Sequence, residues 1–173
     1  LPALLDIAAS WGAVRSGPHT LALYPRNELL RDQAREALQV VTALGPLDSK
    51  KDSGSVRIGL LYGSTPRQRD LEGTQDTRGW KRLANGWASP FFPCLTDNCQ
   101  GSLIWSDEDR TSGIERLICS ACRFATLPGT LALTRESMTR NPPDILFSST
   151  EMMSQQSTNS GLGRLLGWKG PNG

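Results

Sequence analysis

The sequence predicts an α/β protein with a parallel sheet, interrupted by a separate segment that carries all four cysteines. Two short apolar runs flank an amphipathic helical pattern in the first third of the chain. Two cysteine pairs follow, and apolar and helical segments alternate again after them. The 173 residues suffice for one domain with a small insert. We expect an α/β part at 1–62, a connecting loop at 63–90, an insert at 91–127 and a second α/β part at 128–173.

The first third of the chain contains a helix, a strand, a second helix and a second strand. Leucines and a tryptophan at helical spacing predict a helix over residues 1–15. The apolar run Thr20–Tyr24 suits a strand buried on both faces, and Val56–Tyr62 suits a second one. Between them, residues 27–44 carry one apolar stripe, and Gly45 is a natural helix end. The stripe consists of Leu30, Ala34, Ala37, Val41 and Leu44. Strand, helix and strand predict a right-handed βαβ unit.

The later segments are shorter. Residues 63–90 are polar, rich in glycine and without clear periodicity, so we expect a loop or a partly helical connection. After the cysteine region, residues 131–140 predict a strand end that leads into a short helix. The segment "PPDILFSS" predicts a buried strand opened by prolines, and residues 150–156 and 159–167 predict helical turns.

Composition excludes some classes of protein. The 19 basic and 17 acidic residues give a net charge of +2, so bulk charge does not support a strongly basic nucleic-acid binder. No apolar run approaches the roughly 20 residues that span a bilayer, and no signal segment opens the chain. We therefore expect a cytoplasmic protein without a membrane partner, in which four cysteines are less suited to disulfides.

The four cysteines predict one metal site. Cys94 and Cys99 are separated by four residues, Cys119 and Cys122 by two, and nineteen residues lie between the pairs. Zinc ribbons place two such pairs on two hairpin turns that converge on one tetrahedral ion. Four cysteine ligands leave no open position, so we expect structural Zn²⁺ without catalytic chemistry. Four unrelated buried or paired cysteines, or a redox pair at the C-terminal motif, are the alternatives.

The predicted ribbon has recognisable supporting segments. "GSLIW" and "ERLIC" predict the two strands that join the cysteine turns, and Gly101 helps the chain double back. Several aromatic residues near the insert either pack it or form a surface for a partner. They are Trp80, Trp87, Phe91 and Phe92.

Two further segments resemble a known family. "LALYPRNELLRDQ" is an apolar strand that runs through proline into a helix, and "PPDILFSSTEMM" is a strand that ends before a short helix. They resemble motifs Ia and Ib of superfamily 2 helicases, the DEAD/DEAH-box-like group. The first segment is most similar to a Tyr-Pro-x-Asn-x-Leu form, followed by Asp-Gln, in large bacterial helicases. The matching residues are Tyr24, Pro25, Asn27, Leu29, Asp32 and Gln33.

The resemblance implies a partial RecA-like (P-loop NTPase) sheet and a contact to the sugar-phosphate backbone of DNA or RNA. It assigns that contact to Pro25, Arg26, Asn27, Ser149, Thr150 and Glu151. Both segments start helices, whose free N–H groups favour an anion. The same residues also suit plain helix capping by Thr150 and a solvated surface charge at Arg26. A four-cysteine insert between these motifs is known in the family, several members of which serve bacterial anti-phage defence.

The motifs for ATP hydrolysis are absent from this sequence. No Gly-x-x-x-x-Gly-Lys-Ser/Thr segment and no Asp-Glu-x-His/Asp segment occurs. We therefore expect a fragment between motifs I and II, without catalytic residues and inactive alone. ATP and Mg²⁺ would bind only in the full-length parent, and the remainder of the helicase chain would be a partner. The alternative function is a non-enzymatic zinc-ribbon module that binds a protein or a nucleic acid.

Overall fold

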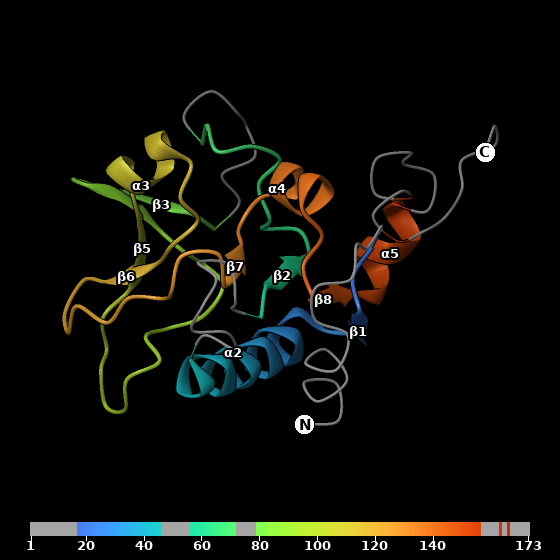
Figure 1. Cartoon of the computed structure of the whole chain (residues 1–173), viewed down its shortest axis with the longest axis horizontal. Helices are drawn as coiled ribbons and strands as arrows, with labels where there is room; N and C mark the ends of the chain where they lie inside the picture. Colours follow the sequence, from blue (N-terminus) through green and yellow to red (C-terminus); the bar gives the residue numbers. More distant parts are fainter. Residues whose placement is uncertain (1–16, 46–55, 72–78, 157–162, 164–165, 167–173) are drawn as a thin grey trace.

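The described part of the chain contains two four-stranded sheets, one parallel and one antiparallel (Figure 1). The computed structural model describes residues 17–45, 56–71, 79–156, 163 and 166. The parallel sheet has the order β1 (Thr20–Tyr24), β8 (Ile145–Ser149), β2 (Ile58–Leu61) and β7 (Leu131–Ala132). The antiparallel sheet has the order β3 (Lys81–Leu83), β4 (Gly86–Ala88), β5 (Leu103–Ser106) and β6 (Ile118–Cys119).

Among the described residues, four helices accompany the sheets: α2 (Asn27–Leu44), α3 (Asp107–Ser112), α4 (Arg135–Arg140) and α5 (Thr150–Gln156). Alternate residues of β8 enter two different cores, since Phe147 packs with α2 and the antiparallel sheet, whereas Leu146 packs with α4 and α5. Both faces of the sheet are therefore covered at β8, which explains why all five residues of this strand are buried. The predicted α/β class with a parallel sheet is confirmed.

The predicted strands and helix of the first third form, with three corrections. β1 is not buried on both faces as predicted, because it lies at the edge of the sheet with Leu21 40% and Leu23 47% exposed. Strands β1 and β2 both run parallel to β8, which lies between them, so the β1–α2–β2 connection skips one strand. The stripe of α2 is shifted from the predicted one. Leu38 is fully buried, whereas Leu44 is 55% exposed. The face of α2 that meets the sheet carries Leu30, Ala34, Leu38 and Val41, which are spaced by four, four and three residues as one helical face requires. Gly45 ends the helix at φ 67°, as predicted.

The prediction of a loop over residues 63–90 is wrong in its last part. Strands β3 and β4 form a hairpin there, joined by the two residues Ala84 and Asn85. Each strand has three residues, and all of β3 is exposed, so neither shows an apolar period. Gly86 (φ 156°) allows the close approach of β5, because a Cβ atom there would collide with the Trp105 carbonyl oxygen.

The two sheets share one aromatic core. The centroid of the Trp80 ring lies 5.4 Å from that of Phe91 and 6.0 Å from that of Trp105. The Phe91 centroid lies 5.7 Å from that of Tyr62, the residue after β2. All four of the aromatic residues noted beside the insert are buried, at 7% exposure or less. They therefore pack the insert against the parallel sheet and do not form an open surface.

Some expected elements fall outside the described residues. These are the helix over 1–15 and nearly all of the helical turn over 159–167. Within the described part of the chain, no helix combines the length and the apolar character that a membrane span requires.

The shift of the α2 stripe can be tested by stability. Leu38→Ala removes a fully buried side chain and should lower the free energy of unfolding by about 2–5 kcal/mol. Leu44→Ala is the matched control on the same helix and should change it by less than about 0.5 kcal/mol. Urea titration followed by circular dichroism measures both. Equal losses in the two variants would contradict this packing of α2.

Candidate metal centre

The four cysteine sulfurs converge on one point. The Sγ atoms of Cys94 and Cys122 lie 3.5 Å apart, those of Cys99 and Cys119 lie 3.6 Å apart, and all four lie within 4.8 Å of one another. Zinc bonded to thiolates at about 2.3 Å in a tetrahedron would place the sulfurs about 3.8 Å apart. All four cysteines are free thiols, so the cluster can hold a metal ion.

Backbone N–H groups of the two turns point at the sulfurs. Thr96 donates to Cys94, Gly101 to Cys99 and Ala121 to Cys119, each over 3.4 Å between N and Sγ. Each donor lies two residues after its cysteine, which is the geometry of a tight turn folded around a thiolate. Hydrogen bonds of this kind stabilise the negative sulfur that a metal needs.

Left-handed residues shape both turns. Asn98, just before Cys99, has φ 58°, and Arg123, just after Cys122, has φ 64°. Asparagine adopts this conformation more readily than most residues, whereas arginine does so at a cost. The strain at Arg123 is tolerated because the neighbouring backbone is fixed, with the Cys119 N–H donating to the Phe124 carbonyl over 2.7 Å.

The strands between the cysteine pairs hold the two turns together. The predicted segment "GSLIW" covers all of β5 except its last residue, and "ERLIC" contains β6; the two strands pair antiparallel with Leu103 opposite Cys119. The Ser120 N–H donates to the Ser102 carbonyl over 2.9 Å, and the Cys94 N–H donates to Gly101 over 3.3 Å. Gly101 sits so close to the other turn that a Cβ atom there would collide with the Cys119 sulfur.

The thiols differ in acidity. Burial raises the pKa of Cys94 to about 11. The Thr96 hydroxyl, helped by the Phe124 backbone N–H, lowers the pKa of exposed Cys122 to about 6. Burial opposes ionisation of Cys119, but the backbone N–H groups of Cys122 and Ala121 leave its pKa below the ordinary value. Binding of a metal must therefore displace at least the Cys94 proton at neutral pH.

The metal centre is anchored to the parallel part of the fold. Cys94, Leu95 and Cys119 belong to the core that α2 shares with both sheets. The Gln39 side chain donates to the Leu95 carbonyl over 3.4 Å, and Arg31 Nη1 donates to the Pro90 carbonyl over 3.3 Å. The first cysteine turn is thus held against α2.

A buried carboxylate makes a second connection that no sequence pattern indicated. Glu115 Oε2 accepts from Arg57 Nη2 over 3.0 Å. Its Oε1 accepts from both the backbone N–H and the hydroxyl of Thr134, each over 3.1 Å, and the Ser137 hydroxyl also donates to the carboxylate. These partners lie just before β2 and at the start of α4, so Glu115 ties the insert to the parallel sheet.

The residues expected to contact nucleic acid meet at one edge of the parallel sheet. Tyr24 lies opposite Ser149 in the β1–β8 register, so Pro25–Asn27 and Thr150–Glu151 follow the carboxyl ends of neighbouring strands. These five residues are exposed. Ser149 is 6% exposed, and its Oγ accepts from the Met152 N–H over 3.1 Å. Ser149, and not Thr150, is therefore the residue that caps α5.

Comparison with known protein families, with curated proteins and with solved structures gave no match to this chain. The helicase resemblance therefore rests on the residues themselves.

Removal of one ligand should release the metal. Cys119→Ser should abolish binding of the ion and unfold the insert, because three thiolates cannot close the site. Ala121→Ser, in the same turn, is the control and should keep one metal ion per chain. Elemental analysis after purification under reducing conditions measures the metal, and near-ultraviolet circular dichroism of the buried tryptophans measures the fold. A metal-free, folded wild-type chain would contradict the assignment.

The contact between the two turns gives an independent test. Gly101→Ala should lower metal affinity by on the order of tenfold or more, because its methyl group would displace the Cys119 sulfur. Gly63→Ala is the control, since nothing lies within 4 Å of a Cβ atom there. Competition with a chromophoric chelator measures both affinities. Unchanged affinity in Gly101→Ala would mean that the two turns do not approach as described.

Proposed function

We propose that this chain is the part of a RecA-like ATP-dependent helicase or translocase that holds the sugar-phosphate backbone of one nucleic-acid strand. The observation that carries the proposal is the β1–β8 register, with Tyr24 opposite Ser149. It brings the two segments that resemble motifs Ia and Ib to neighbouring positions, although they are far apart in the sequence. Ligands of open parallel α/β sheets bind beyond the carboxyl ends of the strands, and both segments lie there.

The start of α2 supplies donors for a phosphate. Arg26 is the N-cap residue of this 18-residue helix, and its side chain makes no capping hydrogen bond. The first N–H groups of a helix lack partners within the helix and attract anions. Because the Arg26 side chain is exposed, it can add a direct charge to the same phosphate. Such contacts read no base, as a translocating motor requires.

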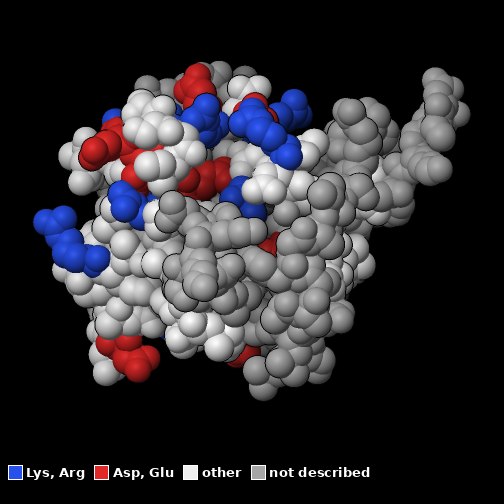
Figure 2. Space-filling model, in the orientation of Figure 1, with Lys and Arg blue, Asp and Glu red and all other residues white. Residues whose placement is uncertain are grey.

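The electrostatic contribution should be small. Arg26 is accompanied by exposed Glu28 and Glu151, so the edge has no excess of positive charge. Basic and acidic side chains are likewise interspersed over α3 and α4 in Figure 2, for example in the ion pairs of Arg82 with Asp107 and Arg140 with Glu136. Fixed backbone N–H groups would therefore supply most of the affinity, with a weak dependence on salt.

The metal is proposed to be Zn²⁺ in a structural role. Four thiolates in a closed tetrahedral arrangement suit zinc and leave no position for a substrate. ATP and Mg²⁺ would bind elsewhere in the full-length parent, since this sequence has no phosphate-loop segment. The alternative of a zinc module that docks a partner is less well supported, because the aromatic residues that would form its surface are buried.

The strand contact can be tested by paired substitution. Arg26→Ala combined with Thr150→Ala should weaken binding of a fluorescein-labelled single-stranded oligonucleotide by about a hundredfold or more, because a hydrogen bond to a charged group, worth about 1.5–3 kcal/mol, is lost at each position. The slope of log affinity against log salt should also fall by about 0.7, for one phosphate contact. Fluorescence anisotropy of the zinc-loaded chain measures both quantities.

Arg140→Ala is the matched control for that experiment. This arginine is exposed on α4, on the opposite face of the sheet from α2, and its loss should leave strand binding unchanged. Unchanged binding in the double variant, together with loss of binding in Cys119→Ser, would contradict the proposal and favour the zinc module as the contact surface.

A further inference from the structure

We infer that the cleft between α2 and the first cysteine turn receives a nucleobase of the strand that the sheet edge holds. This inference rests on the proposed function and names a second contact of the same site. This cleft, called the knuckle cleft below, has a volume of about 340 Å³, at the lower end of the range for small-ligand pockets. Arg31 and Asp32 of α2 line one side of it, and Gln100, Gly101 and Ser102 line the other.

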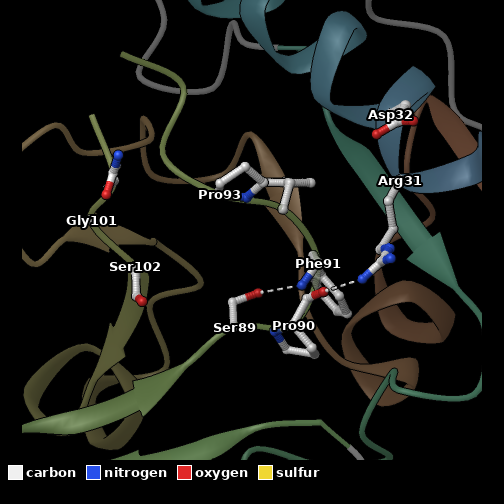
Figure 3. A pocket seen from close by; sticks show the side chains of 10 residues that line it. Arg31, Asp32, Ser89, Pro90, Phe91, Pro93, Gly101 and Ser102 are labelled. Atoms are coloured by element: carbon white, nitrogen blue, oxygen red, sulfur yellow. Dashed lines mark hydrogen bonds between the residues drawn. The ribbon is translucent and has the colours of Figure 1, made fainter. Parts of the chain in front are cut away.

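The polar groups of the knuckle cleft come from opposite walls. Figure 3 shows Arg31 and Asp32 on the α2 side, with Gly101 and Ser102 across from them. Arg31 uses one N–H for the Pro90 carbonyl, over 3.3 Å, and so keeps further donors. The Ser89 oxygen accepts from the Phe91 N–H over 3.2 Å, which leaves the serine O–H to donate. Asp32 has no hydrogen-bond or ion-pair partner among the described residues and remains an acceptor.

The balance of charge selects the ligand class. One guanidinium and one carboxylate line the cleft, so a phosphate would gain the attraction of Arg31 but meet the repulsion of Asp32. A nucleobase is uncharged and carries both hydrogen-bond donors and acceptors on its edges. It can accept from Arg31 and donate to Asp32 at once. The exposed ring of Pro93 and the half-buried ring of Pro90 supply an apolar wall beside its planar ring.

The position of the cleft suits a strand that starts at the sheet edge. Arg31 follows Asn27 by four residues and lies on the same face of α2, about 6 Å further along the helix axis. A strand whose phosphate sits at the N-terminus of α2 can therefore place an adjacent base in the knuckle cleft. Backbone and base would be held by one rigid helix.

The metal centre builds the far wall of the cleft. Gln100, Gly101 and Ser102 directly follow the ligand Cys99. Ser102 is fixed by two hydrogen bonds to the second turn, since its N–H donates to the Ser120 hydroxyl over 3.1 Å and its carbonyl accepts the Ser120 N–H over 2.9 Å. Loss of the metal should therefore remove the base contact and leave the start of α2 intact.

An abasic strand separates the base contact from the phosphate contact. We would compare a single-stranded oligonucleotide with one that has the same backbone but lacks its bases, by fluorescence anisotropy with the zinc-loaded chain. The wild-type chain should bind the base-bearing strand roughly tenfold more tightly, the gain expected from one base contact. Asp32→Asn and Arg31→Ala should each reduce this preference several-fold and leave affinity for the abasic strand nearly unchanged. Chelation of the metal should likewise reduce the preference for the base-bearing strand and leave affinity for the abasic strand nearly unchanged.

Each outcome decides between the two proposals. Equal binding of both strands by the wild-type chain would overturn the base contact and leave the proposed function standing. A loss of affinity for both strands in Arg31→Ala would mean a phosphate contact and would also overturn it. A chain that binds neither strand would overturn the proposed function and the base contact together. Arg140→Ala is again the charge-matched control, and thermal melting confirms that Asp32→Asn, which keeps the side-chain shape, is folded.

Discussion

The meeting of four cysteine sulfurs gives the antiparallel sheet its shape. Its strands have only two to four residues, and isolated hairpins of that length are marginally stable in water. A metal ion held by Cys94, Cys99, Cys119 and Cys122 would connect the first turn directly to the end of β6. The left-handed conformations of Asn98 and Arg123 belong to the two turns that bring these sulfurs together.

The insert packs against the parallel sheet through buried aromatic residues and a buried ion pair. Trp80, Phe91 and Trp105 fill a core that also receives Tyr62, and Glu115 reaches a buried position beside Arg57. A buried ion pair of this kind is costly when one partner is removed, because the other charge is left without compensation. The metal centre, the aromatic core and the Glu115 network are therefore three separate links between the insert and the parallel part of the fold.

The sequence predicted the elements whose pattern is local. Periodic or apolar patterns predicted the elements β1, α2, β2 and β8, and the structure contains all four. The spacing of the cysteines predicted one cluster, and the four sulfurs do converge. The hairpin β3–β4 showed no alternation of apolar and polar residues, because its strands have three residues each and β3 is exposed. Helix α3 did carry a sequence signal, since Ser106 caps its start and Gly113 ends it at φ 77°. The knuckle cleft and the Glu115 network join residues that are distant in the chain, such as Arg31 with Gly101, and only the three-dimensional structure brings them together.

The central place of β8 has a consequence for the order of folding. β8 separates two strands that precede it, and the Ser148 hydroxyl bonds the Leu61 carbonyl 87 positions away. During synthesis, β1 and β2 must therefore wait for the whole insert to emerge before they gain a neighbour. The cysteine turns close over a much shorter span, 28 positions from Cys94 to Cys122. Because short loops close faster than long ones, this topology favours metal capture on the nascent chain first and completion of the parallel sheet last.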